Sequence, residues 1–328
     1  MKPRISILTE AGDGIGYGHL TRMTALAEQL TSHDANVSLI VDKKGTGKPP
    51  QHYPFQVMDW RQTMNLIPKS DTIVVDSYLA EYSDYTLLQN FCQNLVAIDD
   101  YDRIEYPASS VINPNPSFEN SEATAKTAYL GGREWVLLRT DVRVASQKEQ
   151  HRHTIERVAV TLGGSDVNGA LPCLLESIQD KWAIIDVVAG NNEYAISLRK
   201  TFSSGNIHIH GLLNASELVD VFTKSDVVIA ACGQTLHELA FLGVPAIGIC
   251  VGDDQIPNQN FYITAGLLAS KIDCRKSCWI NEVDEAIAVV SSHATRQESS
   301  AKGRALIDGG GTERLSHLLI NLMKNSVH

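Results

Sequence analysis

The chain has 328 residues, of which 43% are hydrophobic and 20% are charged. This composition is typical of a globular protein, and the length suits two domains of about 150 residues each. The formal net charge of −10 provides no basic excess, so we expect no nucleic-acid partner. No apolar run reaches the roughly 18 residues that a membrane span needs, and the first residues show no signal-peptide pattern. With six scattered cysteines, these features predict a monomeric cytoplasmic protein with reduced thiols.

Apolar runs alternate with amphipathic stretches through the first half of the chain. The runs predicted as strands are residues 4–10, 36–42, 71–76, 95–99 and 111–116, the last of which ends at prolines. Residues 19–33 and 83–94 have the apolar spacing of helices. Continuous apolar strands separated by helices predict a parallel sheet covered on both faces.

The same alternation restarts after a polar segment, residues 145–156, which is the best candidate for a linker. The strands predicted beyond it are residues 157–164, 182–190, 206–211, 226–233 and 244–252, and residues 312–325 form a final amphipathic helix. The pattern predicts an α/β protein with two doubly wound Rossmann-like domains facing across a cleft. Their expected bounds are 1–147 and 148–310, with a C-terminal helix, 311–328, that packs back on the first domain. Ligands of such domains bind beyond the carboxyl ends of the strands.

The first glycine-rich loop, GDGIGYGHLTR, follows the first predicted strand and occupies residues 12–22. It does not fit the dinucleotide pattern G-x-G-x-x-G, and no Gly-Lys-Ser/Thr closes it as a phosphate-binding P-loop. It therefore predicts a strand-to-helix turn with a helix that begins near His19. Unpaired amides at a helix N-terminus favour an anion. The residues alone leave open whether His19 acts chemically or only packs at the helix entry.

Two further loops follow strands of the second half. In the loop LGGSDVNG (162–169), Gly163 and Gly164 permit close approach to a ligand, and Ser165 and Asp166 are natural helix caps. This loop suits either a diphosphate oxyanion or a plain capped helix start.

The third loop opens the stretch 231–250. Gly233 precedes a helix whose first turn holds Gln234 and Thr235, and the carboxylate of Glu238 could accept hydrogen bonds from a vicinal diol such as a ribose. The segment 252–260, which includes Asp254 and Gln255, follows the next strand and adds polar groups at the same sheet edge.

Taken in order, the motifs GYGHLTR, GGSD, CGQTLHELAFLGVPAI and GDDQIPNQ resemble those of glycosyltransferase-B-fold proteins that act on UDP-sugars. The resemblance spans nearly the whole chain and is strongest to the UDP-sugar hydrolases of pseudaminic acid biosynthesis. Those enzymes release UDP and the free sugar from UDP-2,4-diacetamido-2,4,6-trideoxy-β-L-altropyranose. Three positions depart from the family pattern: Tyr17, Gln234 and Asp254, the last of which replaces an amide.

The resemblance implies a role for each matching residue. His19 is the implied catalytic residue. The sugar is implied to contact Gly16, Gly18, Asp76, Tyr78, Asp254 and Gln255. The nucleotide is implied to contact Gly163, Gly164, Ser165, Asp166, Gly233, Gln234, Thr235 and Glu238.

A diphosphate is a good leaving group, so cleavage at the anomeric carbon needs one base and charge stabilisation rather than the two carboxyl groups of ordinary glycosidases. A histidine side chain, which usually titrates near pH 6.5, suits that base. We therefore expect inverting hydrolysis with no cofactor and no metal. An inverting glycosyltransferase, a non-catalytic nucleotide-sugar-binding protein and an epimerase remain alternatives.

Overall fold

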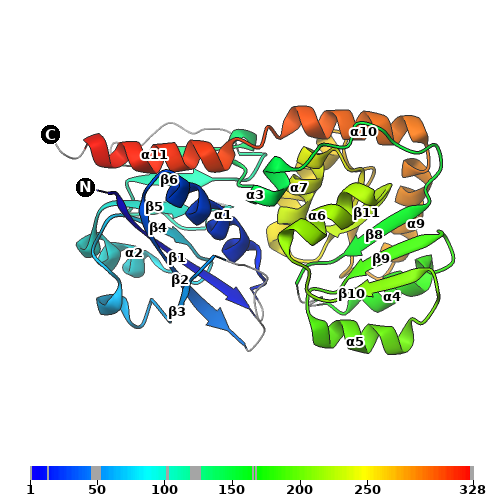
Figure 1. The fold of residues 1–328 in the computed structure, drawn as a ribbon, viewed down its shortest axis with the longest axis horizontal. Helices are drawn as coiled ribbons and strands as arrows, with labels where there is room; N and C mark the ends of the chain where they lie inside the picture. The colour runs from blue at the N-terminus through cyan, green and yellow to red at the C-terminus, as the bar shows by residue number, and fades with distance from the viewer. Residues whose placement is uncertain are drawn as a thin grey trace. The chain divides into compact units, whose positions relative to one another are not determined.

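The computed structural model describes residues 2–12, 15–45, 53–100, 103–118, 127–164, 166 and 168–325. The chain divides into two compact units (Figure 1). The first unit comprises Met1–Thr140 and Gly309–His328, and the second comprises Asp141–Asp308. Each unit is built around one parallel sheet, which confirms the predicted α/β class with two doubly wound domains.

The described strands of the first unit form a seven-stranded sheet in the order β3-β2-β1-β4-β5-β6-β7. The strands are β1 (Arg4–Gly12), β2 (Asn36–Lys44), β3 (Gln56–Val57), β4 (Ser70–Asp76), β5 (Cys92–Ile98), β6 (Ser110–Asn113) and β7 (Ala128–Gly131). The helices are α1 (Gly18–Ser32), α2 (Tyr82–Leu88), α11 (Gly311–Asn325) and the short η1 (Met64–Leu66), η2 (Gln89–Phe91) and η3 (Arg133–Trp135). The strand order reverses between β1 and β4, and ligands of open α/β sheets bind beyond the carboxyl ends of strands at such a point.

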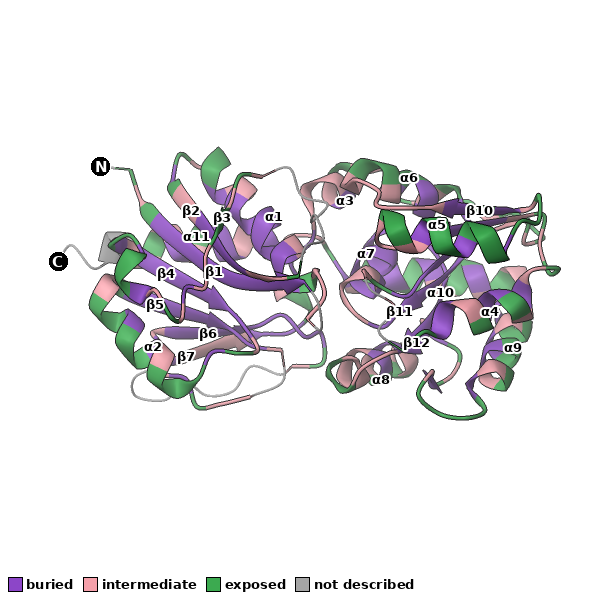
Figure 2. Ribbon diagram, turned by 90° about the horizontal axis from the view of Figure 1, so that it is seen from below, coloured by how far each residue is buried: buried purple, intermediate pink, exposed green. Residues whose placement is uncertain are grey.

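Both faces of the sheet are buried along β1, β4, β5 and β6, which are mostly purple in Figure 2, whereas the edge strands β3 and β7 are more exposed. One face packs against α1 and α11, and the apolar side chains of those helices share a core with β1. The opposite face packs against α2 and the segment around Trp60, which is fully buried. Because helices and loops cover both sides of this parallel sheet, its strands are expected to be apolar at successive positions, as they are in the sequence.

The described strands of the second unit form a six-stranded parallel sheet in the order β10-β9-β8-β11-β12-β13. The strands are β8 (Arg157–Thr161), β9 (Ile184–Val188), β10 (Ile207–His210), β11 (Val227–Ala231), β12 (Ala246–Cys250) and β13 (Ile272–Asp273). The helices are α3 (Thr140–Val144), α4 (Ala170–Ile178), α5 (Asn192–Thr201), α6 (Ala215–Lys224), α7 (Gln234–Leu242), η4 (Asp253–Gln255), α8 (Ile256–Thr264), α9 (Trp279–Val290) and α10 (His293–Leu306). Here β8 and β11 occupy the centre, so their carboxyl ends lie side by side.

Two boundaries differ from those expected. The first unit ends at Thr140 rather than at residue 147. The end of the intervening segment is tied to the second unit, because Nε2 of Gln147 donates to the carbonyl of Phe241 at 2.8 Å. The helix predicted over 83–94 is also too long. Cys92 begins β5 and pairs with Ser70 of β4, so sheet pairing replaces the last predicted turn.

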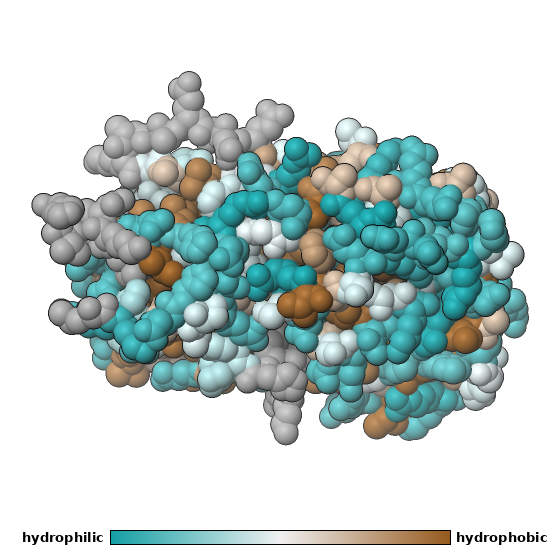
Figure 3. Space-filling model, turned by 45° about the horizontal axis from the view of Figure 1, so that its top comes forward, coloured by the Kyte–Doolittle hydropathy of each residue, from teal (hydrophilic) through white to brown (hydrophobic). Residues whose placement is uncertain are grey.

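Within the described ranges, no helix is long and apolar enough to cross a membrane. The face drawn in Figure 3 carries mostly hydrophilic residues, and its hydrophobic residues form small separate groups. All six cysteines have free thiols.

Candidate active site

The glycine-rich loop after β1 is a tight turn that delivers His19 to the carboxyl edge of the first sheet. Gly12 has a φ of 116°, and a Cβ there would lie 1.9 Å from the carbonyl oxygen of Lys44. The N–H of Gly16 donates to the carbonyl of Gly12 at 2.8 Å, and α1 begins two residues later at Gly18. No atom lies within 4 Å of a Cβ placed at Gly16 or Gly18, so the backbone there is open to a ligand.

His19 stands in the first turn of α1 against the end of β4. Its Nδ1 lies 2.7 Å from Oδ1 of Asp76, the last residue of that strand, and both side chains are buried. An ionised carboxylate can only accept, so Nδ1 donates and the lone pair is on Nε2. Nε2 has no hydrogen-bond partner among the described residues, which makes it the atom able to take a proton.

Arg22, one turn after His19 on α1, joins the buried carboxylate of Asp76 to the partly buried carboxylate of Asp100. Its Nε and Nη2 each donate to Asp76 at 2.6 Å, and its Nη1 donates to Asp100 at 2.7 Å. Burial by itself would raise the pKa of Asp76, but the Arg22 charge and the bonds from Arg22 and His19 hold that pKa well below its usual range. The same guanidinium outweighs burial and lowers the pKa of Asp100. Both carboxylates are therefore ionised, with one permanent cation between them.

Tyr78 completes this group, which we call the His19 cluster: His19, Arg22, Asp76, Tyr78 and Asp100. The Tyr78 hydroxyl donates to Asp100 at 2.7 Å, and its ring meets the His19 ring edge to face with centroids 4.1 Å apart. The backbone N–H of Tyr78 donates to the buried carboxylate of Glu10 at 2.6 Å, which fixes the loop after β4. The imidazole is thereby held on two sides.

The structure thus brings together three of the predicted residues, His19, Asp76 and Tyr78. Sequence reasoning missed Arg22 and Asp100. A signal was present for each: Arg22 is three residues from His19 and so on the same helix face, and Asp100 directly follows a predicted strand.

In the second unit, the glycine loop after β8 is open on one side and tightly packed on the other. Gly163 has a φ of 92°, and among the described residues no atom outside the adjacent positions lies within 4 Å of a Cβ placed there. A Cβ on Gly190 would instead lie 2.5 Å from the carbonyl oxygen of Gly164. Ser165 lies outside the described residues. The free approach to Gly163 agrees with a ligand-facing loop.

The Asp166 carboxylate is directed at the protein. It accepts from the N–H groups of Ala170 and Leu171 at 2.9 and 3.1 Å, and from the Tyr194 hydroxyl at 2.5 Å. Asp166 therefore shapes the loop and caps the start of α4. Its contact with a nucleotide remains a prediction.

The loops after β11 and β12 lie at the same edge of this sheet, since these strands are neighbours. Gly233 precedes α7, whose first turn, with Gln234 and Thr235, has no side-chain cap and no acidic residue. Oε1 of Gln255 accepts from the N–H of Val251 at 3.3 Å, and its Nε2 would lie 3.5 Å from a Cβ placed at Gly233. An uncapped helix N-terminus beside a glycine is a suitable place for an anion.

The remaining two predicted residues of this unit differ in exposure. Glu238 lies on α7 and is fully buried, whereas Asp254 is exposed in η4. Asn168 and Asn258 connect the loops: their amides donate to the carbonyls of Val251 and Cys232 at 2.7 and 3.3 Å.

No model of a known protein family matches the chain. The uncharacterized protein MJ1062 of Methanocaldococcus jannaschii is 22% identical over 280 residues, which cover 74% of this chain. The match covers 55% of MJ1062, so the chain spans about half the length of this curated relative.

Several solved structures match almost the full chain. Acinetobacter baumannii MurG has a TM-score of 0.67 at 15% identity and covers 97% of this chain and 100% of its own. The MnaA–UDP structure from S. aureus has a TM-score of 0.65 at 12% identity, covering 98% and 97%. The chain has the glycosyltransferase-B fold. Spinosyn rhamnosyltransferase SpnG, complexed with thymidine diphosphate, shares it with a TM-score of 0.63 at 14% identity, covering 96% and 99%.

Proposed function

We propose that this chain is a nucleotide-sugar hydrolase that cleaves the anomeric C–O bond of a UDP-linked deoxy-acetamido sugar with inversion. The observation that carries the proposal is the His19–Asp76 pair, a buried imidazole oriented by an ionised carboxylate with Nε2 left to act as a base. The motif resemblance to the pseudaminic acid hydrolases supports the substrate class. The absence of an apolar span among the described helices and the free thiols agree with a cytoplasmic reaction.

In this mechanism, Nε2 of His19 takes a proton from water as the water oxygen attacks the anomeric carbon. The bond between that carbon and the diphosphate oxygen breaks, and its electron pair leaves with UDP. Asp76 stabilises the imidazolium that forms. Arg22 keeps Asp76 ionised and in place, and Asp100 in turn holds the guanidinium of Arg22. His19 then returns the proton to solvent. Attack from the face opposite the leaving group inverts the anomeric configuration.

We assign the nucleotide to the second unit. The open Gly163 loop and the uncapped start of α7 present backbone amides to a diphosphate. Glu238, one turn further along α7, is the proposed ribose contact. The solved structures of this fold with bound UDP and thymidine diphosphate support a nucleoside diphosphate as the ligand class. No metal or cofactor enters the proposed reaction.

An inverting glycosyltransferase is the second candidate, favoured by the glycosyltransferases among the structures that share the fold. His19 would then take its proton from an acceptor hydroxyl instead of water. A non-catalytic nucleotide-sugar-binding protein would have no need of the oriented imidazole, so the His19 cluster argues against that reading.

The deciding experiment follows UDP release from a panel of UDP-linked acetamido sugars, with and without added acceptor alcohols, in ¹⁸O-labelled water. A hydrolase releases UDP without an acceptor, and the label enters the sugar, whose anomeric configuration is inverted. Label in the UDP phosphate would mean cleavage at phosphorus and would end the anomeric mechanism. UDP release that requires an acceptor would establish the transferase instead.

A further inference from the structure

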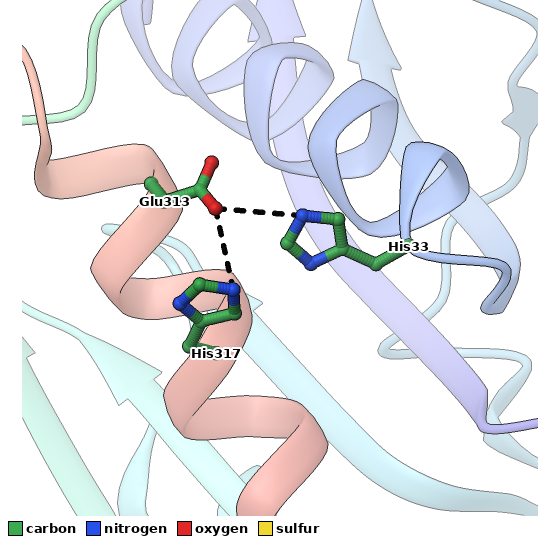
Figure 4. A group of neighbouring side chains, drawn as sticks. All are labelled: His33, Glu313 and His317. Carbon is green, nitrogen blue, oxygen red and sulfur yellow. Dashed lines mark ion pairs between the residues drawn. The ribbon is translucent and has the colours of Figure 1, made fainter.

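A second group of titratable side chains lies at the surface of the first unit, apart from the His19 cluster. His33 directly follows α1, while Glu313 and His317 lie one turn apart on α11 (Figure 4). The three ligand-capable atoms lie within 4.8 Å of one another. We call this group the α1–α11 triad.

The triad has the dimensions of a metal-binding site. The Oε1 atom of Glu313 lies 3.5 Å from Nε2 of His33 and 3.2 Å from Nε2 of His317. Ligands bound to zinc at 2.0–2.1 Å in a tetrahedron are separated by about 3.3–3.4 Å. The two imidazoles are stacked with centroids 4.9 Å apart and an interplanar angle of 21°. Both rings present Nε2 to the same carboxylate, as the dashed lines in Figure 4 show. Small side-chain movements would place all three atoms around one ion.

Neighbouring groups favour a bound cation. His33 follows the C-terminus of α1, where the helix dipole is negative. Nε2 of Gln29 donates to Oε2 of Glu313 at 2.5 Å, which orients the carboxylate and leaves Oε1 toward the histidines. Gln29 Nε2 also lies 3.2 Å from Nε2 of His33, a contact that an ion would replace. Such hydrogen-bonded supporting groups typically orient metal ligands.

The site is open to solvent. The side-chain exposures of His33, Glu313 and His317 are 24%, 42% and 58%, so an ion can enter and can keep water in its remaining positions. Two imidazoles and one carboxylate suit zinc and the neighbouring divalent transition metals rather than magnesium or calcium.

We propose that the α1–α11 triad binds one divalent transition-metal ion of the zinc class and thereby fastens α11 to α1. The sequence alone shows only a pair of candidate ligands here, Glu313 and His317, four positions apart. His33 joins them because folding brings the two ends of the chain together. The proposed ion is structural and separate from the proposed hydrolysis.

The test is calorimetric titration of the untagged, metal-free full chain with Zn²⁺ near pH 7.5. We expect one ion per chain with a dissociation constant below about 10 µM. His33→Gln and His317→Gln should each weaken binding by more than about tenfold. The matched control, His208→Gln, replaces an exposed histidine of β10 and should bind as the original chain does. Co²⁺ should give the visible absorption of a low-coordinate nitrogen–oxygen site, and this absorption should disappear in the two triad variants.

Thermal unfolding distinguishes a metal site from a simple ion-pair cluster. A ligand that binds only the folded state stabilises it, so Zn²⁺ should raise the melting temperature of the original chain and leave that of the two triad variants nearly unchanged. No binding at about 100 µM Zn²⁺, or equal binding by the triad variants, overturns the proposal. Circular dichroism of each metal-free variant checks that it is folded. The readouts do not use turnover, so they are independent of whether the chain is a hydrolase.

Discussion

At the scale of single residues, the His19 cluster is a charge arrangement with one guanidinium between two ionised carboxylates and a histidine beside them. If His19 is the base, His19→Asn should lower turnover by about 10²–10⁴-fold, because no group then accepts the proton from water. Nucleotide affinity should hardly change, since we assign the nucleotide to the second unit. Steady-state UDP release and calorimetric UDP binding measure the two effects. A variant with near-normal turnover would leave His19 as a packing residue at the helix entry.

Arg22 is the residue whose loss should most disturb the first unit. Arg22→Ala leaves the buried Asp76 and the partly buried Asp100 without their cation, and breaking a buried pair costs about 3–5 kcal/mol. In the original chain, both carboxyl pKa values are depressed, so their stabilisation is present above about pH 4 and is lost only below it.

In the variant, burial without the cation raises those pKa values, so stability should fall as the pH rises from about 4 to 7. Urea denaturation of both chains at these two pH values measures the difference: the variant should lose stability between pH 4 and 7, whereas the contribution of the two carboxylates to the original chain should persist over that interval. An Arg22→Ala chain with the same pH dependence as the original would contradict the charge balance described for the cluster.

Glu238 tests the nucleotide assignment. Glu238→Ala should weaken UDP binding by about 1–3 kcal/mol if the carboxylate accepts hydrogen bonds from the ribose. Calorimetry gives the difference directly, and 2′-deoxy-UDP serves as a matched ligand whose affinity should depend less on this residue. Equal UDP affinity in the two chains would remove Glu238 from the site.

At the scale of elements, the segment that enters the second unit contains a histidine whose ring nitrogens have no hydrogen-bond partner among the described residues. Both ring nitrogens of His151 are buried, and burial, followed by the charges of Lys148 and Arg296, lowers its pKa to about 4. Arg304 and His293 act in the same direction. His151 is therefore neutral in the folded chain at pH values where the unfolded chain already binds a proton.

This difference predicts that stability falls as the pH drops from about 6.5 toward 4, because the unfolded state binds the proton more tightly. Between pH 7 and 5 the loss from this residue should be about 1–2 kcal/mol. His151→Leu should remove that part of the pH dependence, and His208→Leu, at an exposed strand position, should not. Denaturant titrations at both pH values provide the comparison. An unchanged slope in His151→Leu would show that the imidazole is protonated in the fold.

At the scale of the whole molecule, the chain makes its first unit from both of its ends. Leu315 and Leu319 of α11 are fully buried in the core that also contains Ile7 of β1 and Leu26 of α1. Leu315→Ala should cost about 2–5 kcal/mol through lost burial and the cavity left behind. Because Leu315 belongs to the first unit, only the unfolding transition of that unit should shift.

Leu175→Ala, which truncates a fully buried leucine of the second unit, is the matched control and should shift the other transition. Differential scanning calorimetry separates the two. If Leu315→Ala moved both transitions together, the two units would unfold as one cooperative body rather than as separate cores.

The sequence by itself determined the fold class and most of the strands, because buried parallel strands must be continuously apolar and are separated by helices of distinct period. It also determined which loops are rich in glycine and polar groups at strand ends. The shared sheet edge places Asp76 beside His19, whereas the sugar contact that the resemblance implies for Asp76 stays a prediction. The roles assigned to these residues and to those of the second unit remain predictions.

Only the tertiary structure decided how these residues are used. Arg22 pairs with Asp100 across 78 positions of sequence, and Asp166 turns its carboxylate to α4 and Tyr194. His33 meets Glu313 because α11 returns to α1. The spacing of residues along the sequence does not predict such contacts. The free energy that stabilises them comes from burying apolar surface shared by segments that are distant in the sequence.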